Sequence, residues 1–116
     1  MAAKIVFIVT GTGLGTTADG DSAFGSDMLD KLFHTLESPA HRPHAICFYT
    51  EGAKVTCAGS PHLVGLKLLE GLGVQLITCQ TCLDYYGLTD RLAVGQVGGM
   101  VDIVNLIADA DRVVTV

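Results

Sequence analysis

The stretch VQLITCQTCLDYYGL, residues 74–88, decides how the rest of this chain is interpreted. Its first part, Val74–Thr78, is a short apolar and β-branched run that predicts a buried strand ending on Cys79. Cys82 follows where the pattern predicts the start of a short helix. A helix N-terminus carries a partial positive charge and unpaired N–H groups, and both favour a thiolate over a thiol. The stretch therefore predicts a reactive dithiol at the end of a strand.

Strand and helix signals alternate on both sides of this stretch. Five apolar runs predict strands: Lys4–Thr10, Ala45–Thr50, Val74–Thr78, Leu92–Val97 and Arg112–Val116. Helical spacing or capping signals predict helices that begin at Ser26, at Ser60-Pro61, after Cys82 and at Met100. Strands separated by helices of this length favour a parallel sheet covered on both faces. We therefore expect residues 1–116 to form one α/β domain.

The composition limits the classes of function. The chain is 49% hydrophobic and only 16% charged, with a mean hydropathy of +0.47. So few charges on so small a domain suggest buried subunit interfaces, and we expect a homo-oligomer. A net charge of −5 argues against direct nucleic-acid binding. Because neither a membrane span nor a signal peptide is apparent, we expect a cytoplasmic protein whose four cysteines are thiols rather than disulfides.

The glycine-rich segment after the first strand does not fit a nucleotide-binding motif. Residues Gly11–Ser26 contain a G-x-G pair, but Thr16 replaces the third glycine of the dinucleotide fingerprint. In a phosphate-binding loop the lysine would fall at Asp21, whose negative charge would repel phosphate. We expect a flexible loop over the carboxyl edge of the sheet, where it could act as a lid.

The cysteines differ in what their positions favour. Cys47 lies in the middle of an expected strand, which predicts a small buried apolar residue. Cys57 follows an expected strand, which places it at the same edge of the sheet as Cys79. Lys54 is the one cation placed to help a thiolate at this edge. One alternative is a zinc site in which Cys57 and His62 join Cys79 and Cys82, although their spacing matches no standard zinc motif. The other is that Cys79 and Cys82 are inert, packed thiols. No base partner is evident for any of the four histidines.

The start of the helix after the strand should affect the thiol pKa in opposing ways. The amides around Thr81–Asp84 are expected to face the site and stabilise a thiolate, whereas the Asp84 carboxylate opposes them. Burial by Leu83, Tyr85 and Tyr86 would raise the pKa. On balance we expect at least one thiol to titrate below free cysteine, with no metal and no cofactor involved.

Two longer segments carry a family resemblance. FYTEGAKVTCAGSP, followed by CQTCLDYYGLTDRLAVGQVGGMVDIVNLI, resembles the DsrE/DsrF-like family and most closely the C-terminal domain of YedF-type sulfurtransferase-like proteins, which are linked to selenium metabolism. The resemblance covers essentially the whole chain and implies a three-layer α/β/α fold around a five-stranded parallel sheet. Thr50 stands where the family usually has Asn, and the sequence opens directly on its first expected strand, whereas YedF-type proteins usually have an upstream TusA-like domain with its own cysteine.

The resemblance also implies a function. Sulfur-relay relatives carry a persulfide on a cysteine at the end of the third strand, which matches Cys79, and the second YedF-type cysteine matches Cys82. A separate donor, either a TusA-like protein or a cysteine desulfurase, would then supply the sulfur, and an acceptor thiol would receive it. A dithiol/disulfide redox module, or a non-catalytic subunit that binds a partner or small ligand, remain alternatives.

Overall fold

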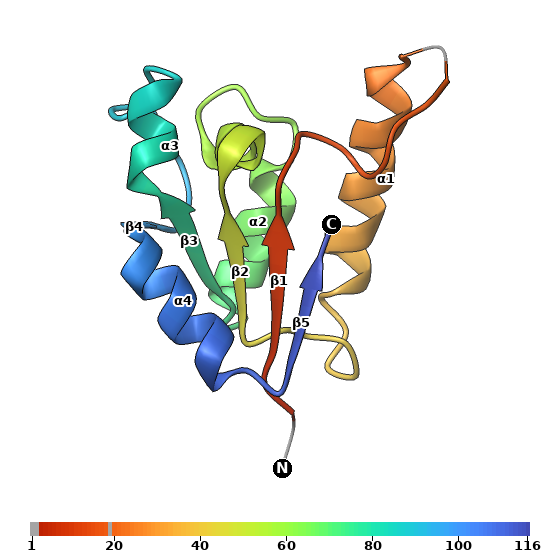
Figure 1. Ribbon diagram of the computed structural model, residues 1–116. Helices are drawn as coiled ribbons and strands as arrows, with labels where there is room; N and C mark the ends of the chain where they lie inside the picture. The colour runs from red at the N-terminus through yellow and green to blue at the C-terminus, as the bar shows by residue number, and fades with distance from the viewer. Residues whose placement is uncertain (1–2, 19) are drawn as a thin grey trace.

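A computed structural model describes residues 3–18 and 20–116. Five parallel strands form one sheet in the order β4-β3-β2-β1-β5 (Figure 1). The strands are β1 (Ile5–Val9), β2 (Ala45–Phe48), β3 (Gln75–Cys79), β4 (Gln96–Gly98) and β5 (Arg112–Thr115). The helices are α1 (Ser22–Thr35), the 3₁₀ helix η1 (Thr50–Thr56), α2 (Leu63–Gly71), α3 (Gln80–Tyr85) and α4 (Met100–Asp109).

The order of the strands explains the three layers. From β1 the chain steps outward to β2 and β3, and its crossover helices α1 and α2 lie together behind the sheet (Figure 1). From β4 it returns to the opposite edge at β5, and α4 lies in front. Right-handed crossovers require this arrangement, because reversing the direction of travel moves the connecting helix to the other face. The α/β fold with a five-stranded parallel sheet is confirmed.

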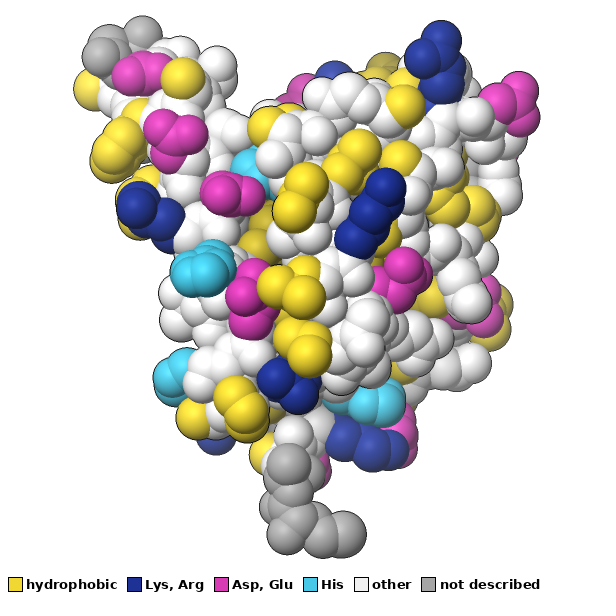
Figure 2. Space-filling view, turned by 180° about the vertical axis from the view of Figure 1, so that it is seen from behind, with side chains coloured by type: hydrophobic (Ala, Val, Ile, Leu, Met, Phe, Trp, Pro, Cys, Tyr) yellow, Lys and Arg dark blue, Asp and Glu magenta, His cyan; other side chains and the backbone are white. Residues whose placement is uncertain are grey.

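Alternating side chains of the strands build a core on each face of the sheet. Behind the sheet, Phe48 of β2 packs with Phe33 of α1 and Leu66 of α2. In front, Ile8 of β1 and Ile103 of α4 pack in the same cluster as Cys47 and Cys79. Figure 2 shows the molecule from behind, with hydrophobic side chains down the middle of this face. Val64 and Leu68 of α2 and Leu72, which caps its C-terminus, are exposed apolar residues.

The first helix begins one turn earlier than expected. Asp21 is its N-cap, and the carboxylate accepts hydrogen bonds from the N–H groups of Ala23 and Phe24 at 3.1 and 3.3 Å. The prediction that the helix begins at Ser26 is therefore wrong, and the glycine-rich loop ends before Ser22. The physical reason is that Asp21 satisfies the first free N–H groups, which makes Ser26 an interior helical residue.

Three other boundaries also differ from those expected. The hydroxyl of Ser60 accepts from the N–H of His62 at 3.1 Å, and α2 begins only at Leu63. The expected strand Ala45–Thr50 ends at Phe48, and Thr50–Thr56 form η1, which the sequence patterns did not predict. The expected strand Leu92–Val97 begins only at Gln96, the first residue of β4. Leu92 instead forms an isolated antiparallel bridge with Cys57, and the backbone of Gly95 is left-handed, with a φ of +77°. Within the described part of the chain, no helix has the length and apolar character needed to cross a bilayer.

Candidate functional site

Two cysteines meet at the carboxyl edge of the sheet. Cys79 ends β3 and is 3% exposed, whereas Cys82 lies on α3 and is partly exposed. The Sγ atom of Cys82 accepts a hydrogen bond of 3.0 Å from the backbone N–H of Thr50, the first residue of η1. A second strand end therefore contributes to the thiol pair, since η1 begins two residues after the last residue of β2.

Thr50 adopts an unusual backbone conformation to reach this position. Its φ is +50°, a left-handed value that β-branched residues rarely adopt. Its hydroxyl oxygen lies 3.0 Å from the carbonyl oxygen of Thr10 and 2.7 Å from that of Tyr49. Sequence reasoning gave Thr50 no role, although its replacement of the usual Asn was a usable signal, because Asn tolerates left-handed backbone well.

The pKa of Cys82 lies above the ordinary cysteine value. Burial is the largest cause; the Thr50 N–H opposes it, and the neighbouring Cys79 raises the pKa further. The expected acidification by a helix end is therefore wrong for Cys82. The physical reason is that burial outweighs the helix-end effect at Cys82, which lies in the first turn of α3, two residues after the helix begins at Gln80.

This raised pKa predicts how Cys82 reacts with pH. A thiol reacts as its thiolate, so alkylation of Cys82 by iodoacetamide should be slow at neutral pH and should keep accelerating above the pH at which free cysteine reaches its plateau. Peptide mass mapping of the rate against pH measures this, with free cysteine as the reference. A plateau for Cys82 below that of free cysteine would contradict the prediction.

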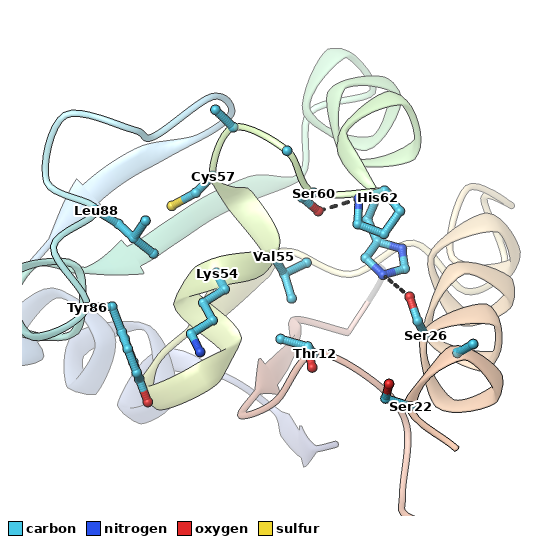
Figure 3. Close-up of a pocket in the computed structure, with 14 residues that line it drawn as sticks. Thr12, Ser22, Ser26, Lys54, Val55, Cys57, Ser60, His62, Tyr86 and Leu88 are labelled. Atoms are coloured by element: carbon cyan, nitrogen blue, oxygen red, sulfur yellow. Dashed lines mark hydrogen bonds between the residues drawn. The ribbon is translucent and has the colours of Figure 1, made fainter. Parts of the chain in front are cut away.

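Lys54 lies at the expected edge but points to other partners. Its Nζ atom is 3.9 Å from Glu51 Oε1 and 4.4 Å from the centre of the Tyr86 ring. Among the described contacts, none joins Lys54 to Cys79 or Cys82. The Tyr86 ring holds the ammonium group by a cation–π interaction at the mouth of a neighbouring pocket, which Figure 3 shows.

The other residues expected to support the thiols lie on the outer side of α3. Asp84 accepts hydrogen bonds from Thr89 at 2.7 Å and Gln80 at 2.8 Å, and these contacts lower its pKa, Thr89 most. Thr81 is exposed, and Tyr85 is 82% exposed with its ring edge-to-face against Tyr86. Asp84 thus ties α3 to the turn that follows it, and no described contact links it, Thr81 or Tyr85 to a thiol.

Cys57 is a close neighbour of the pair, and Cys47 is part of the core. The Cys57 thiol donates to the carbonyl oxygen of Ala53 at 3.2 Å and packs in a small cluster that Cys82 also contacts. Burial raises the pKa of Cys57, and it raises the pKa of Cys47 to about 11. At neutral pH both are protonated, which suits packing rather than nucleophilic attack.

His62 has partners that sequence reasoning missed. Its Nε2 atom lies 3.2 Å from the Ser26 hydroxyl and its Nδ1 atom 3.2 Å from Asp30 Oδ1. The expectation that the histidines lack partners is thus wrong here, because α1 and the start of α2 are far apart in sequence and meet only in the fold. Across residues 3–18 and 20–116, no cluster of three or more His, Cys, Asp or Glu residues has a metal-binding arrangement.

The fold and the cysteine pair define the class of protein. It is a parallel α/β domain with two thiols at the carboxyl edge of its sheet. The chain belongs to the DsrE/DsrF-like family, which it matches over residues 4–116. That family is generally linked to sulfur relay. Comparison with curated proteins yields no sequence match.

Solved structures share the fold at low sequence identity. The ychN protein of E. coli is 18% identical with a TM-score of 0.69, and the alignment covers 99% of this chain and 100% of that one. MTH1491 of Methanobacterium thermoautotrophicum is 18% identical with a TM-score of 0.73, covering 99% and 100%. BT1422 of Bacteroides thetaiotaomicron is 14% identical with a TM-score of 0.64, covering 97% and 95%.

Proposed function

We propose that this chain is a sulfur-relay protein, of the YedF type, that carries a persulfide on Cys79 and passes it to an acceptor thiol. The supporting observation is the position of Cys79. The residue ends an interior strand of the sheet and pairs with Gly98 of β4, so its backbone is fixed beside a second thiol. A site on a rigid element holds a reacting group more precisely than a loop does.

The transfer is a nucleophilic displacement with no net oxidation. The Cys79 thiolate attacks the outer sulfur of a donor persulfide, the donor S–S bond breaks, and the donor leaves as a thiolate. Cys79 then carries the outer sulfur until an acceptor thiolate attacks it in the same way. Cys82 acts as the resolving or co-binding thiol, and the Thr50 N–H stabilises negative charge on its sulfur. The donor is a TusA-like protein or a cysteine desulfurase, and we place the reaction in the cytoplasm, where thiols stay reduced.

A dithiol/disulfide redox module is the second candidate. The observation that favours it is the contact between the Cys79 and Cys82 side chains, each of which is a free thiol. In that function the pair would reduce a substrate disulfide and become a disulfide itself.

Incubation with a persulfide donor tests the proposal. We expect the reduced protein to gain one sulfur atom by intact mass, and to lose it again when a low-molecular-weight acceptor thiol is added. A protein that instead loses two hydrogens by forming a Cys79–Cys82 disulfide, and whose Cys82→Ser variant gains no sulfur from the same donor, would support the redox module. A protein that changes in neither way would overturn both and favour a binding subunit.

We also propose that the protein is a homo-oligomer. The front helix α4 exposes Met100, Val101 and Val104, which are 54%, 73% and 50% exposed. Apolar side chains gathered on one helix are typical of an interface between subunits. Multi-angle light scattering should therefore give a mass above that of one chain, and Val101→Glu should lower it, whereas the opposite-face variant Val64→Glu should not. A monomeric mass for the wild type at micromolar concentration would contradict this.

A further inference from the structure

A pocket lies between α1 and the segment that joins η1 to α2, with Tyr86 and Leu88 at the end away from α1 (Figure 3). Its volume is about 600 Å³, within the range of small-molecule sites. Val55, Pro61 and Leu88 supply apolar walls, and Lys54 is the one Lys or Arg among the described residues that line it. Neither Cys79 nor Cys82 is among those lining residues.

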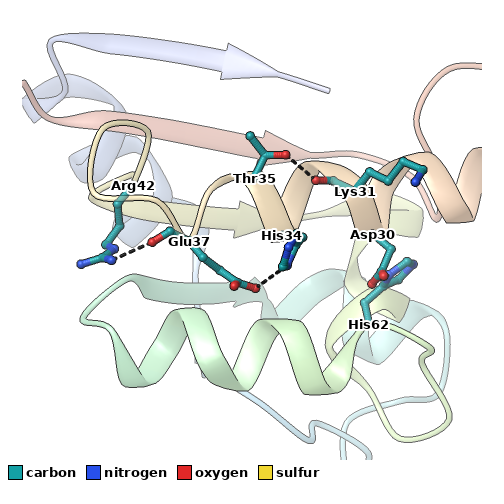
Figure 4. Close-up of polar contacts among 7 residues, drawn as sticks. All are labelled: Asp30, Lys31, His34, Thr35, Glu37, Arg42 and His62. Atoms are coloured by element: carbon teal, nitrogen blue, oxygen red, sulfur yellow. Dashed lines mark hydrogen bonds and ion pairs between the residues drawn. The ribbon is translucent and has the colours of Figure 1, made fainter.

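Three side chains form a hydrogen-bonded chain at one wall of this pocket. The Ser26 hydroxyl lies 3.2 Å from His62 Nε2, and Asp30 Oδ1 lies 3.2 Å from His62 Nδ1 (Figures 3 and 4). Since an ionised carboxylate only accepts, the proton of the neutral ring lies on Nδ1 and is donated to Asp30. The Nε2 lone pair is then free to accept from Ser26. This is the arrangement in which a histidine draws the proton from a serine.

The fold holds the histidine firmly in this orientation. Ser26 and Asp30 lie one turn apart on α1, so they face the same neighbour. His62 is 2% exposed, its backbone N–H donates to the Ser60 hydroxyl, and its ring meets that of Phe33 edge-on at 5.7 Å. The ring is thus fixed by contacts on several sides, while both it and Ser26 line the pocket.

We propose that Ser26 is a nucleophile for acyl transfer, with His62 as its general base and Asp30 as a positioning residue. The substrate class is a small carboxylic ester with an apolar body, which the walls of the pocket suit. An anionic group on the substrate would face the Lys54 ammonium. This activity is separate from the sulfur relay, because it uses a different pocket and different residues.

The reaction balances without an added oxidant or metal. Ser26 Oγ attacks the ester carbonyl carbon while its proton passes to His62 Nε2. The bond from that carbon to the leaving oxygen breaks, and His62 returns the proton to the leaving alcohol. Water, deprotonated by the same nitrogen, then attacks the acyl carbon. The bond from that carbon to Ser26 Oγ breaks, His62 returns the proton to Ser26 Oγ, and the carboxylic acid is released.

Labelling with a fluorophosphonate and turnover of p-nitrophenyl acetate test this. We expect peptide mapping to place the phosphonyl group on Ser26 of the folded wild type. Since general-base catalysis contributes about 10²–10⁴-fold, Ser26→Ala should lower ester turnover by about 100-fold or more. Ser38→Ala is the control, because Ser38 is exposed and is not among the residues that line the pocket, and it should retain both labelling and turnover.

Asp30 requires a separate readout. Asp30→Asn should lower the labelling rate at least ~10-fold, because an amide favours the wrong ring tautomer, and Asp30→Glu should restore part of it. The midpoint of urea unfolding should not move in parallel with these rates. A wild type that remains unlabelled at Ser26, or a Ser26→Ala protein with undiminished turnover, would overturn the proposal and leave His62 as a structural residue that joins α1 to α2.

Discussion

We expect the Cys79→Ser variant to accept no sulfur from a persulfide donor, whereas Cys82→Ser still accepts it. Serine keeps the shape of the side chain and its place at the end of β3, but its oxygen does not form a persulfide. Cys82 lies on the short helix α3 and is therefore held less rigidly than the end of a strand. Intact-protein mass measurement after incubation with the donor gives the number of sulfur atoms on each variant.

The remaining thiols provide the controls for this experiment. Cys57→Ser should load sulfur like the wild type, because Cys57 is buried and its thiol donates to the Ala53 carbonyl. Undiminished loading of Cys79→Ser, together with loss in Cys82→Ser, would assign the persulfide to Cys82. That outcome has a physical basis, since Cys82 is the more exposed thiol and already accepts the Thr50 N–H.

The Gly52→Ala variant should be strongly destabilised. Gly52 lies in η1, where the helix meets the end of β1 without any intervening side chain. A Cβ atom there would overlap the carbonyl oxygen of Val9 and lie 2.7 Å from its carbonyl carbon, and both atoms belong to a central strand. Because backbone cannot rotate away as a side chain can, we expect a loss at or above the ~3 kcal/mol that overpacking of a core reaches.

Gly65→Ala is the matched control for this variant. Gly65 lies in α2, and no described atom outside its own helix neighbourhood lies within 4 Å of a Cβ placed there. The same chemical change should therefore stabilise the protein by about 0.5–1 kcal/mol, through helix propensity. Urea unfolding midpoints compare the two. A Gly52→Ala protein with the wild-type midpoint would show that η1 does not press on β1 as described.

Gly52 also connects stability with the thiol site. The N–H of Gly52 donates a hydrogen bond to the Tyr49 carbonyl at 3.0 Å. Thr50, the residue after Tyr49, donates its N–H to the Sγ atom of Cys82. A shift of η1 away from β1 would therefore move the donor away from the Cys82 sulfur. The close approach at Gly52 thus positions a group of the proposed site as well as closing the core.

Local sequence patterns were sufficient to predict the elements that form the sheet. The run KIVFIVT and the apolar stretch before Cys79 mark strands buried on both faces, and the helical spacing of Leu29, Phe33 and Leu36 marks a helix packed on them. These signals are short-range, because burial of each element repeats with the period of its own backbone. The boundaries were less predictable, since the Asp21 carboxylate and the Ser60 hydroxyl compete with the helix for the same N–H groups.

The sequence by itself determined that a strand ends on Cys79 and that Cys82 follows close behind, since both facts depend only on local order. Only the tertiary structure decided which groups surround them. Thr50 reaches Cys82 from a neighbouring strand end, and His62 joins Ser26 and Asp30 across more than thirty residues of chain. The physical reason is that a parallel sheet gathers the ends of its strands at one edge, whatever their separation in sequence. Burial at that edge raises the pKa of Cys82 and outweighs the lowering that a helix end, judged from local order alone, would predict.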